Sequence, residues 1–175
     1  MLQRGVTPVL GFAAASGTGK TTLLKALIPR LRAKGLCVGL IKHTHHDLEL
    51  DQPGKDSYEL RKAGASPVLI ASAHRRVMFS EHEMVREPIL AEELAILDVC
   101  GLDLILVEGF RHECFPKIEI RRSGLNAPPL FPGDPSIIAL AMDTPSFPGS
   151  TLPVLDLNDP DAVVRFILDV FLGRG

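Results

Sequence analysis

The chain has 175 residues, enough for one domain with a sizeable core, and its 46% hydrophobic content excludes an intrinsically disordered protein. The charges sum to −2 and the chain has no Trp, so neither charge nor aromatic content indicates nucleic-acid binding. No apolar run approaches the roughly 18 residues that span a bilayer, so we expect no membrane partner. The three cysteines are widely spaced, which favours a reduced, cytoplasmic compartment over a disulfide framework.

Strand-like and helix-like segments alternate along the chain. Apolar runs predict strands at 6–13, 36–41, 67–73, 76–80, 102–107, 137–142 and 154–157. Helical spacing predicts helices that end at Gly35 and Gly64, a third over 88–100 and a last one beginning near Pro160. This alternation predicts an α/β fold with a mostly parallel sheet, helices on both faces and some antiparallel edge strands.

Two local features refine this outline. Residues 117–121 alternate polar and apolar side chains, which predicts a half-exposed strand. Asp56 is expected to cap the second helix, with Glu59 three residues later as its capping-box partner. We expect residues 1–175 to form a single domain with a small β insertion around 110–135.

The segment AASGTGKT, residues 14–21, follows a strand and opens a helix. It matches the P-loop pattern G-x-x-x-x-G-K-[ST], except that Ala14 replaces the first glycine. Gly17 and Gly19 let backbone N–H groups turn toward a phosphate at a helix N-terminus. We expect Lys20 to reach the β- and γ-phosphates and the Thr21 hydroxyl to bind Mg²⁺. The sequence therefore predicts a three-layer, P-loop NTPase-like nucleotide-binding fold.

A second strand end supplies a carboxylate. Glu108 follows the apolar run 102–107, and an acidic residue at this place in a P-loop protein holds the Mg²⁺ shell. Gly109 either lets the backbone approach the γ-phosphate or makes a turn. Because strand 137–142 ends at the same edge, Asp143 is expected to accept hydrogen bonds from N1–H and the 2-amino group of guanine.

A histidine-rich loop, KHTHHD at residues 42–47, follows the second strand. It allows an anion site, with Lys42 and His43 on phosphate and Asp47 on a Mg²⁺-bound water. It also allows a zinc or nickel site, since imidazole and carboxylate suit these ions. Against tight metal binding, neighbouring side chains of an extended chain alternate direction, which sets His46 opposite His43 and His45. Lys55 and Asp56 add polar groups just beyond this loop.

Four segments of the chain resemble the MobB family. They are SGTGKTTL at 16–23, GLIKHTHHD at 39–47, GKDSYELRKAGA at 54–65 and LDLILVEGF at 102–110. The resemblance implies a GTP-binding protein that uses Mg²⁺, has weak GTPase activity and works as a homodimer. It also implies an adaptor for a MobA-type enzyme, which joins GMP to molybdopterin, and thus contact with molybdopterin or its guanine dinucleotide form.

Residue by residue, the resemblance assigns a phosphate or Mg²⁺ role to Ser16, Gly17, Thr18, Gly19, Lys20, Thr21 and Thr22. It puts His43, Asp47 and Glu108 near the γ-phosphate or the substrate. One alternative is a metal-insertion GTPase of the UreG or HypB kind, in which the histidine loop carries the metal. Another is a small-molecule kinase, which the lack of arginine in the proline-rich loop 126–135 disfavours. No arginine finger is evident beside the P-loop, so slow hydrolysis is expected.

Overall fold

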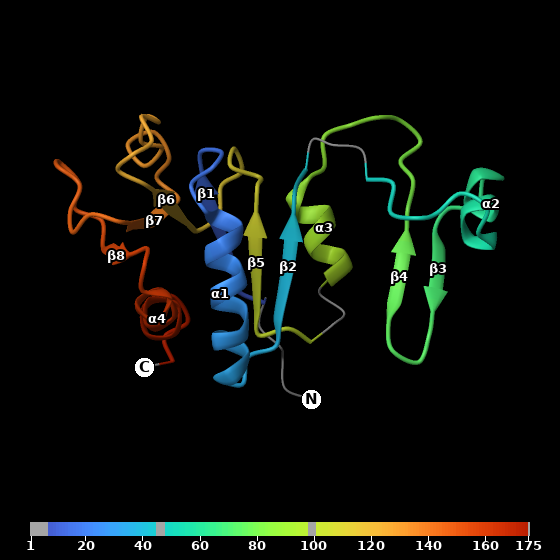
Figure 1. Ribbon diagram of the computed structural model, residues 1–175, viewed down its shortest axis with the longest axis horizontal. Coiled ribbons are helices and arrows are strands. Elements are labelled where there is room, and N and C mark those ends of the chain that lie inside the picture. The colour runs from blue at the N-terminus through green and yellow to red at the C-terminus, as the bar shows by residue number, and fades with distance from the viewer. Residues whose placement is uncertain (1–6, 45–47, 98–100, 175) are drawn as a thin grey trace. The chain divides into compact units, whose positions relative to one another are not determined.

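The computed structural model describes residues 7–44, 48–97 and 101–174 (Figure 1). Contacts divide the chain into two compact units, Met1–His43 with Ile89–Gly175, and Thr44–Pro88. The larger unit contains a six-stranded sheet and the smaller one a two-stranded sheet. Among the helices of the described residues, none is both long enough and apolar enough to cross a membrane.

The sheet of the larger unit is parallel at every pairing and has the order β2-β5-β1-β6-β7-β8. Its strands are β1 (Val9–Ala14), β2 (Val38–Lys42), β5 (Leu104–Glu108), β6 (Lys117–Arg121), β7 (Ile137–Met142) and β8 (Val154–Asp156). The predicted mostly parallel α/β fold is confirmed. Since β5 and β6 flank β1 on opposite sides, the carboxyl end of β1 lies where the chain connections diverge. Open α/β sheets bind ligands at such points.

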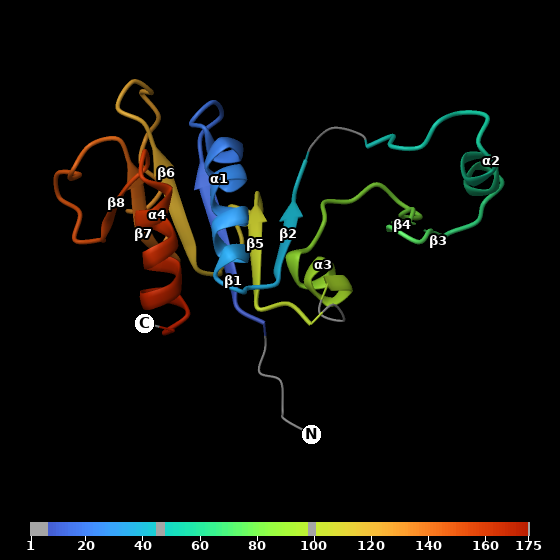
Figure 2. The same cartoon turned by 60° about the horizontal axis from the view of Figure 1, so that its bottom comes forward.

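Helices cover this sheet on both faces. Leu104 and Leu106 of β5 pack in one apolar cluster with α1 (Lys20–Ala33), α4 (Pro160–Arg165) and the π-helix Phe166–Phe171. The alternate residues, Ile105 and Val107, face the other way and pack with α3 (Leu90–Leu97). Figure 2 shows α1 and α4 side by side along the sheet. A strand that is apolar at every position thus joins both layers of the core.

Strand β6 corrects one sequence-based expectation. Residues 117–121 were expected to be half exposed, but β6 lies between β1 and β7, and Lys117 and Glu119 are only 1% and 2% exposed. The Lys117 ammonium lies 2.8 Å from Asp134 and over the ring of Phe115. These contacts compensate for the loss of water around a buried charge. Alternating polarity predicted exposure because the sequence does not reveal such partners.

The smaller unit holds α2 (Asp56–Lys62) and the antiparallel pair β3 (Val68–Ala71) and β4 (Arg76–Phe79). The antiparallel pairing expected at sheet edges lies in this separate hairpin. The predicted capping box does not form: Lys55 is the N-cap of α2, without a side-chain bond, and Asp56 is the first helical residue. Glu59 instead accepts a hydrogen bond from the Gly54 N–H.

Candidate functional site

The P-loop connects the end of β1 to the start of α1. Gly17 and Gly19 have φ angles of 79° and 88°, a left-handed backbone that glycine adopts without strain. Gly19 is the N-cap of α1 and supplies no side-chain cap, and the first turn of the helix has no acidic residue. The first N–H groups of this helix are therefore oriented to receive an anion.

Ala14, where the motif has glycine, creates no difficulty for this loop. It lies in β1 and pairs with Ile120 of β6, so its backbone is that of an ordinary strand residue. The left-handed conformations fall on the two glycines that the sequence retains.

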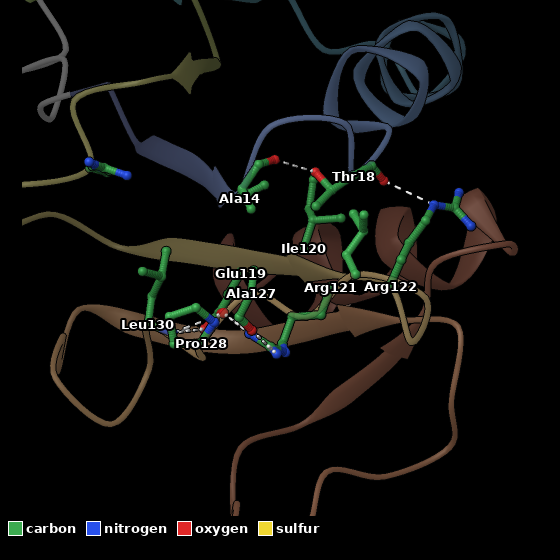
Figure 3. A pocket seen from close by; sticks show the side chains of 12 residues that line it. Ala14, Thr18, Glu119, Ile120, Arg121, Arg122, Ala127, Pro128 and Leu130 are labelled. Atoms are coloured by element: carbon green, nitrogen blue, oxygen red, sulfur yellow. Dashed lines mark hydrogen bonds and ion pairs between the residues drawn. The ribbon is translucent and has the colours of Figure 1, made fainter.

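The structure places the Thr18 side chain inside the loop (Figure 3). Thr18 is 3% exposed, and its hydroxyl donates to the Ala15 carbonyl at 3.0 Å. The Thr18 carbonyl in turn accepts a hydrogen bond from Nε of Arg122 at 3.0 Å. Thr18 therefore contributes to the shape of the loop through its side chain.

One arginine, Arg122, lies beside the P-loop, although no arginine finger is evident there in the sequence. It directly follows β6, and a Cβ built on Gly19 would lie 3.4 Å from its terminal amino nitrogen. The sequence signal was present, since Arg122 directly follows the strand predicted at 117–121. The sequence does not reveal that this strand, β6, pairs with β1, and it is this pairing that brings Arg122 to the P-loop.

Glu108 lies at the opposite side of the loop, at the end of β5. Its Oε1 accepts from the Thr21 hydroxyl at 3.5 Å, and its Oε2 lies 3.6 Å from Nζ of Lys42. The structure thus brings three predicted site residues together from three elements. A hydroxyl and a nearby carboxylate are hard oxygen donors, which fit the requirements of Mg²⁺. Thr21 would bind the ion and Glu108 would hold its water shell.

His43 and Gly109 meet where β2 and β5 end. The His43 N–H donates to the Glu108 carbonyl at 2.8 Å, and the His43 ring lies 5.0 Å from that of Phe110. A Cβ on Gly109, whose φ is 104°, would lie 2.5 Å from Cβ of His43. Gly109 therefore permits a close approach to His43, a contact that the sequence does not predict.

The remaining histidine-loop residues, His45, His46 and Asp47, lie outside the described residues. Within the described ranges, no three His, Cys, Asp or Glu side chains are grouped so that they could hold a metal ion. Lys55 and Asp56 belong to the smaller compact unit, where they form the start of α2.

Asp143 follows β7 and holds the turn after β6. Its two carboxylate oxygens accept from the backbone N–H and the hydroxyl of Ser123, at 2.9 and 3.2 Å. The Ser123 N–H bond is the main reason why the pKa of Asp143 lies below its usual range, with the Arg122 charge adding to it. Asp143, Ser123 and Arg122 thus form a connected path from β7 to the P-loop backbone.

Comparison with known proteins identifies the family. Residues 9–143 match the family described as molybdopterin guanine dinucleotide synthesis protein B, MobB. The chain belongs to the MobB family. A relative from Escherichia coli (strain K12), named molybdopterin-guanine dinucleotide biosynthesis adapter protein, is 46% identical over 97% of this chain and 96% of its own length. A Haemophilus influenzae protein of the same name is 39% identical over 91% and 87%.

Solved MobB structures share the fold. The MobB protein homolog from Bacillus stearothermophilus superposes with a TM-score of 0.69 at 22% identity, over 95% of this chain and 99% of its own. MobB from Bacillus subtilis superposes with a TM-score of 0.70 at 24% identity, over 95% and 97%. At identities this low, the superpositions show that the fold is shared, which is the P-loop NTPase-like fold. The assignment to the MobB family rests on the sequence matches.

Proposed function

We propose that this protein binds GTP together with Mg²⁺ at the P-loop. The observation that carries the proposal is the convergence of Thr21, Glu108 and Lys42 beside an uncapped helix N-terminus. The N–H groups and Lys20 suit the phosphates, while the hydroxyl and carboxylate suit the metal ion that would neutralise them. Asp143 follows β7 at the edge where the base would lie, and its carboxylate suits the two donors of guanine.

We further propose that the protein acts as an adaptor in the synthesis of molybdopterin guanine dinucleotide. Its partner would be a MobA-type guanylyltransferase, and molybdopterin or its guanine dinucleotide form would be the molecule passed on. The names of the Escherichia coli and Haemophilus influenzae relatives support this role. The guanylyl transfer itself would belong to the partner.

GTP hydrolysis by the isolated protein is proposed to be slow. The arginine that the structure brings to the P-loop, Arg122, donates its Nε to the Thr18 carbonyl on the loop backbone. An arginine placed on the phosphates themselves is worth roughly 10³–10⁵ in rate. A turnover well below about one per second is expected without the partner, and faster turnover would contradict this part of the proposal.

A homodimer is also proposed. Several apolar side chains of the hairpin are exposed, including Leu69 at 58% and Met78 at 48%. Burial of such a surface between two copies would be favourable. Light scattering should give twice the chain mass for the wild type and half of that for Leu69→Lys combined with Met78→Lys. A monomeric wild type would contradict the dimer.

The nucleotide proposal is tested by Lys20→Ala. Loss of a charge-assisted phosphate contact costs about 1.5–3 kcal/mol, so GTP affinity should fall by at least tenfold while the fold persists. Arg32→Ala, which removes an exposed charge from the same helix, is the matched control. Isothermal titration measures both variants, and unchanged affinity in folded Lys20→Ala would remove the P-loop from the site.

The adaptor proposal is tested by affinity purification from cell extract. A MobA-type guanylyltransferase should co-purify with the tagged wild-type protein. Recovery should depend on added GTP and decrease with Lys20→Ala. Absence of the enzyme under every nucleotide condition would contradict the partnership while leaving the nucleotide site intact.

A further inference from the structure

The smaller unit has no apolar core among the residues that the structure describes for it. Across residues 48–88, Arg61 of α2 is the one buried residue, with 8% of its surface exposed. The large apolar side chains of this segment are exposed instead, including Leu50 at 74%, Leu60 at 60% and Leu69 at 58%. A two-stranded hairpin is at best marginally stable in water without further packing. The contacts that organise this unit therefore have to be sought around Arg61.

Arg61 connects three segments of the smaller unit. Its two terminal amino groups donate to Glu81 at 2.6 Å and to Glu49 at 2.5 Å. Glu49 precedes α2 in the chain and Glu81 follows β4. The guanidinium also lies over the ring of Phe79, the last residue of β4, and over the ring of Tyr58, at 5.2 and 5.5 Å from the ring centres. One side chain of α2 thus holds the helix to the hairpin and to the segment that leads into the helix.

A guanidinium is suited to this position and an ammonium is not. Its planar fork donates to two carboxylates at once while its faces stack on aromatic rings. Both glutamates keep contact with water, at 43% and 54% side-chain exposure, so they stay charged opposite Arg61. The hydrogen bond from Arg61 holds the pKa of Glu81 below its usual range. Without its partners the buried charge of Arg61 would be costly, so the Arg61 cluster, Arg61 with Glu49 and Glu81, stabilises the unit as a set.

We propose that Arg61 is the residue that positions α2 against the hairpin and thereby shapes the apolar surface that a second copy would cover. The positioning takes place within one chain, whereas the covered surface rests on the homodimer proposed above. Exposed apolar side chains lie on both elements, Leu60 on α2 and Leu69 and Met78 on the hairpin. When the Arg61 cluster is broken, the smaller unit is expected to open locally, because the larger unit has apolar clusters of its own.

Amide hydrogen exchange of the full-length protein, followed by mass spectrometry at low protein concentration, tests the positioning. In Arg61→Gln, whose shorter neutral side chain cannot bond both glutamates, peptides from β3 and β4 should exchange at least about tenfold faster than in the wild type. Peptides from β5 should exchange as in the wild type. Arg61→Lys keeps the charge but not the fork and should exchange at an intermediate rate. Arg75→Gln, the same substitution in the exposed turn of the hairpin, should leave all rates unchanged.

The interface is tested by sedimentation equilibrium of the same variants. The dissociation constant of the homodimer should rise at least about tenfold in Arg61→Gln and stay at the wild-type value in Arg75→Gln. A monomeric wild type would contradict the homodimer alone, since exchange of the hairpin amides still reports on Arg61. Dimerisation that is unchanged in Arg61→Gln despite faster exchange would overturn the role of Arg61 in the interface.

Should Arg61→Gln fail to fold, Glu81→Gln removes one charge of the Arg61 cluster from a half-exposed position and should accelerate exchange of the hairpin amides by about threefold or more. Equal exchange of β3 and β4 in the wild type and in the Arg61 and Glu81 variants would overturn the positioning role. So would an Arg75→Gln variant whose hairpin exchanges as fast as that of Arg61→Gln.

Discussion

Strands β5 and β6 flank the P-loop strand on its two sides, yet they are stabilised in different ways. Residues Leu104–Val107 of β5 are apolar and buried, whereas β6 also buries the charged side chains of Lys117 and Glu119. The first strand needs only a hydrophobic environment on both faces. The second needs specific partners, because an unpaired buried charge is costly. The core around the P-loop therefore has one side fixed by packing and one fixed by ion pairs.

The ends of the two strands differ in charge as well. β5 ends in Glu108, which contacts Thr21 and Lys42, while β6 is followed by Arg122, which contacts the Thr18 carbonyl. The P-loop thus has a carboxylate on one side and a guanidinium on the other. We infer that the β5 side would serve the metal ion of a bound nucleotide, while the β6 side supports the loop backbone.

The largest expected effect is on stability, from Glu119→Ala in β6. Removing this carboxylate leaves Arg121 and two backbone N–H groups without their partner, which costs about 3–5 kcal/mol. A conservative change in β5, Ile105→Val, should cost only about 0.5–1.5 kcal/mol. Urea denaturation followed by circular dichroism measures both. Similar losses in the two variants would remove the distinction between the strands.

Asp143→Ala should affect nucleotide selectivity. If the carboxylate reads guanine, GTP affinity falls by about 1–3 kcal/mol, or roughly tenfold to a hundredfold. In the wild type, inosine triphosphate, which lacks the 2-amino group, should bind with an affinity between those of GTP and ATP. In the variant the three affinities should converge.

Ser123→Ala is the control for Asp143, since it removes one of the two bonds to the carboxylate and leaves the carboxylate in place. Selectivity for GTP should persist in this variant. If full selectivity for GTP also survives in Asp143→Ala, the base contact lies elsewhere. Residues 155–158, at the end of β8, are then the next candidates.

A smaller effect is expected from Arg122→Ala. Its bond to the Thr18 carbonyl supports the loop without contacting the base, so GTP and ATP affinities should fall together by about threefold to tenfold. Arg122→Lys keeps the charge but not the guanidinium geometry and should recover only part of the loss. Calorimetric titration of both nucleotides measures this. A loss confined to GTP would instead indicate that Arg122 contacts guanine.

The smallest effect is a pH dependence centred on Asp134. Burial works to raise its pKa, but the Lys117 ammonium and the Ser136 N–H outweigh it and hold the pKa below the usual value. The associated stability is therefore present above about pH 4 and is lost as pH falls through the folded-state pKa, at about 1.4 kcal/mol per unit of difference. Unfolding free energies of wild type and Asp134→Asn should converge in acid. A gap that widens in acid would contradict this assignment.

The two sides of the P-loop also differ in how well they could be predicted from the sequence. The P-loop, β5 and Glu108 were recognisable because apolar runs, glycine spacing and a terminal carboxylate are local signals. The strand at 117–121 was also predicted, but its burial and the position of Arg122 beside the P-loop were not, because both depend on which strands become neighbours. The buried state of Lys117 depends on Asp134, which lies 17 residues later in the chain. Likewise, Gly109 was recognised as a special residue, but its contact with His43 required the sheet order.

The central claim is that the β5 side of the P-loop holds the metal ion of a bound nucleotide. The most direct measurement is calorimetric titration of GTP into wild type and Glu108→Gln, each with Mg²⁺ and with EDTA. We predict that Mg²⁺ strengthens GTP binding to the wild type by at least tenfold and that Glu108→Gln loses most of this gain while keeping its affinity in EDTA. An equal Mg²⁺ effect in both proteins, or no GTP binding by the folded wild type, would contradict the account.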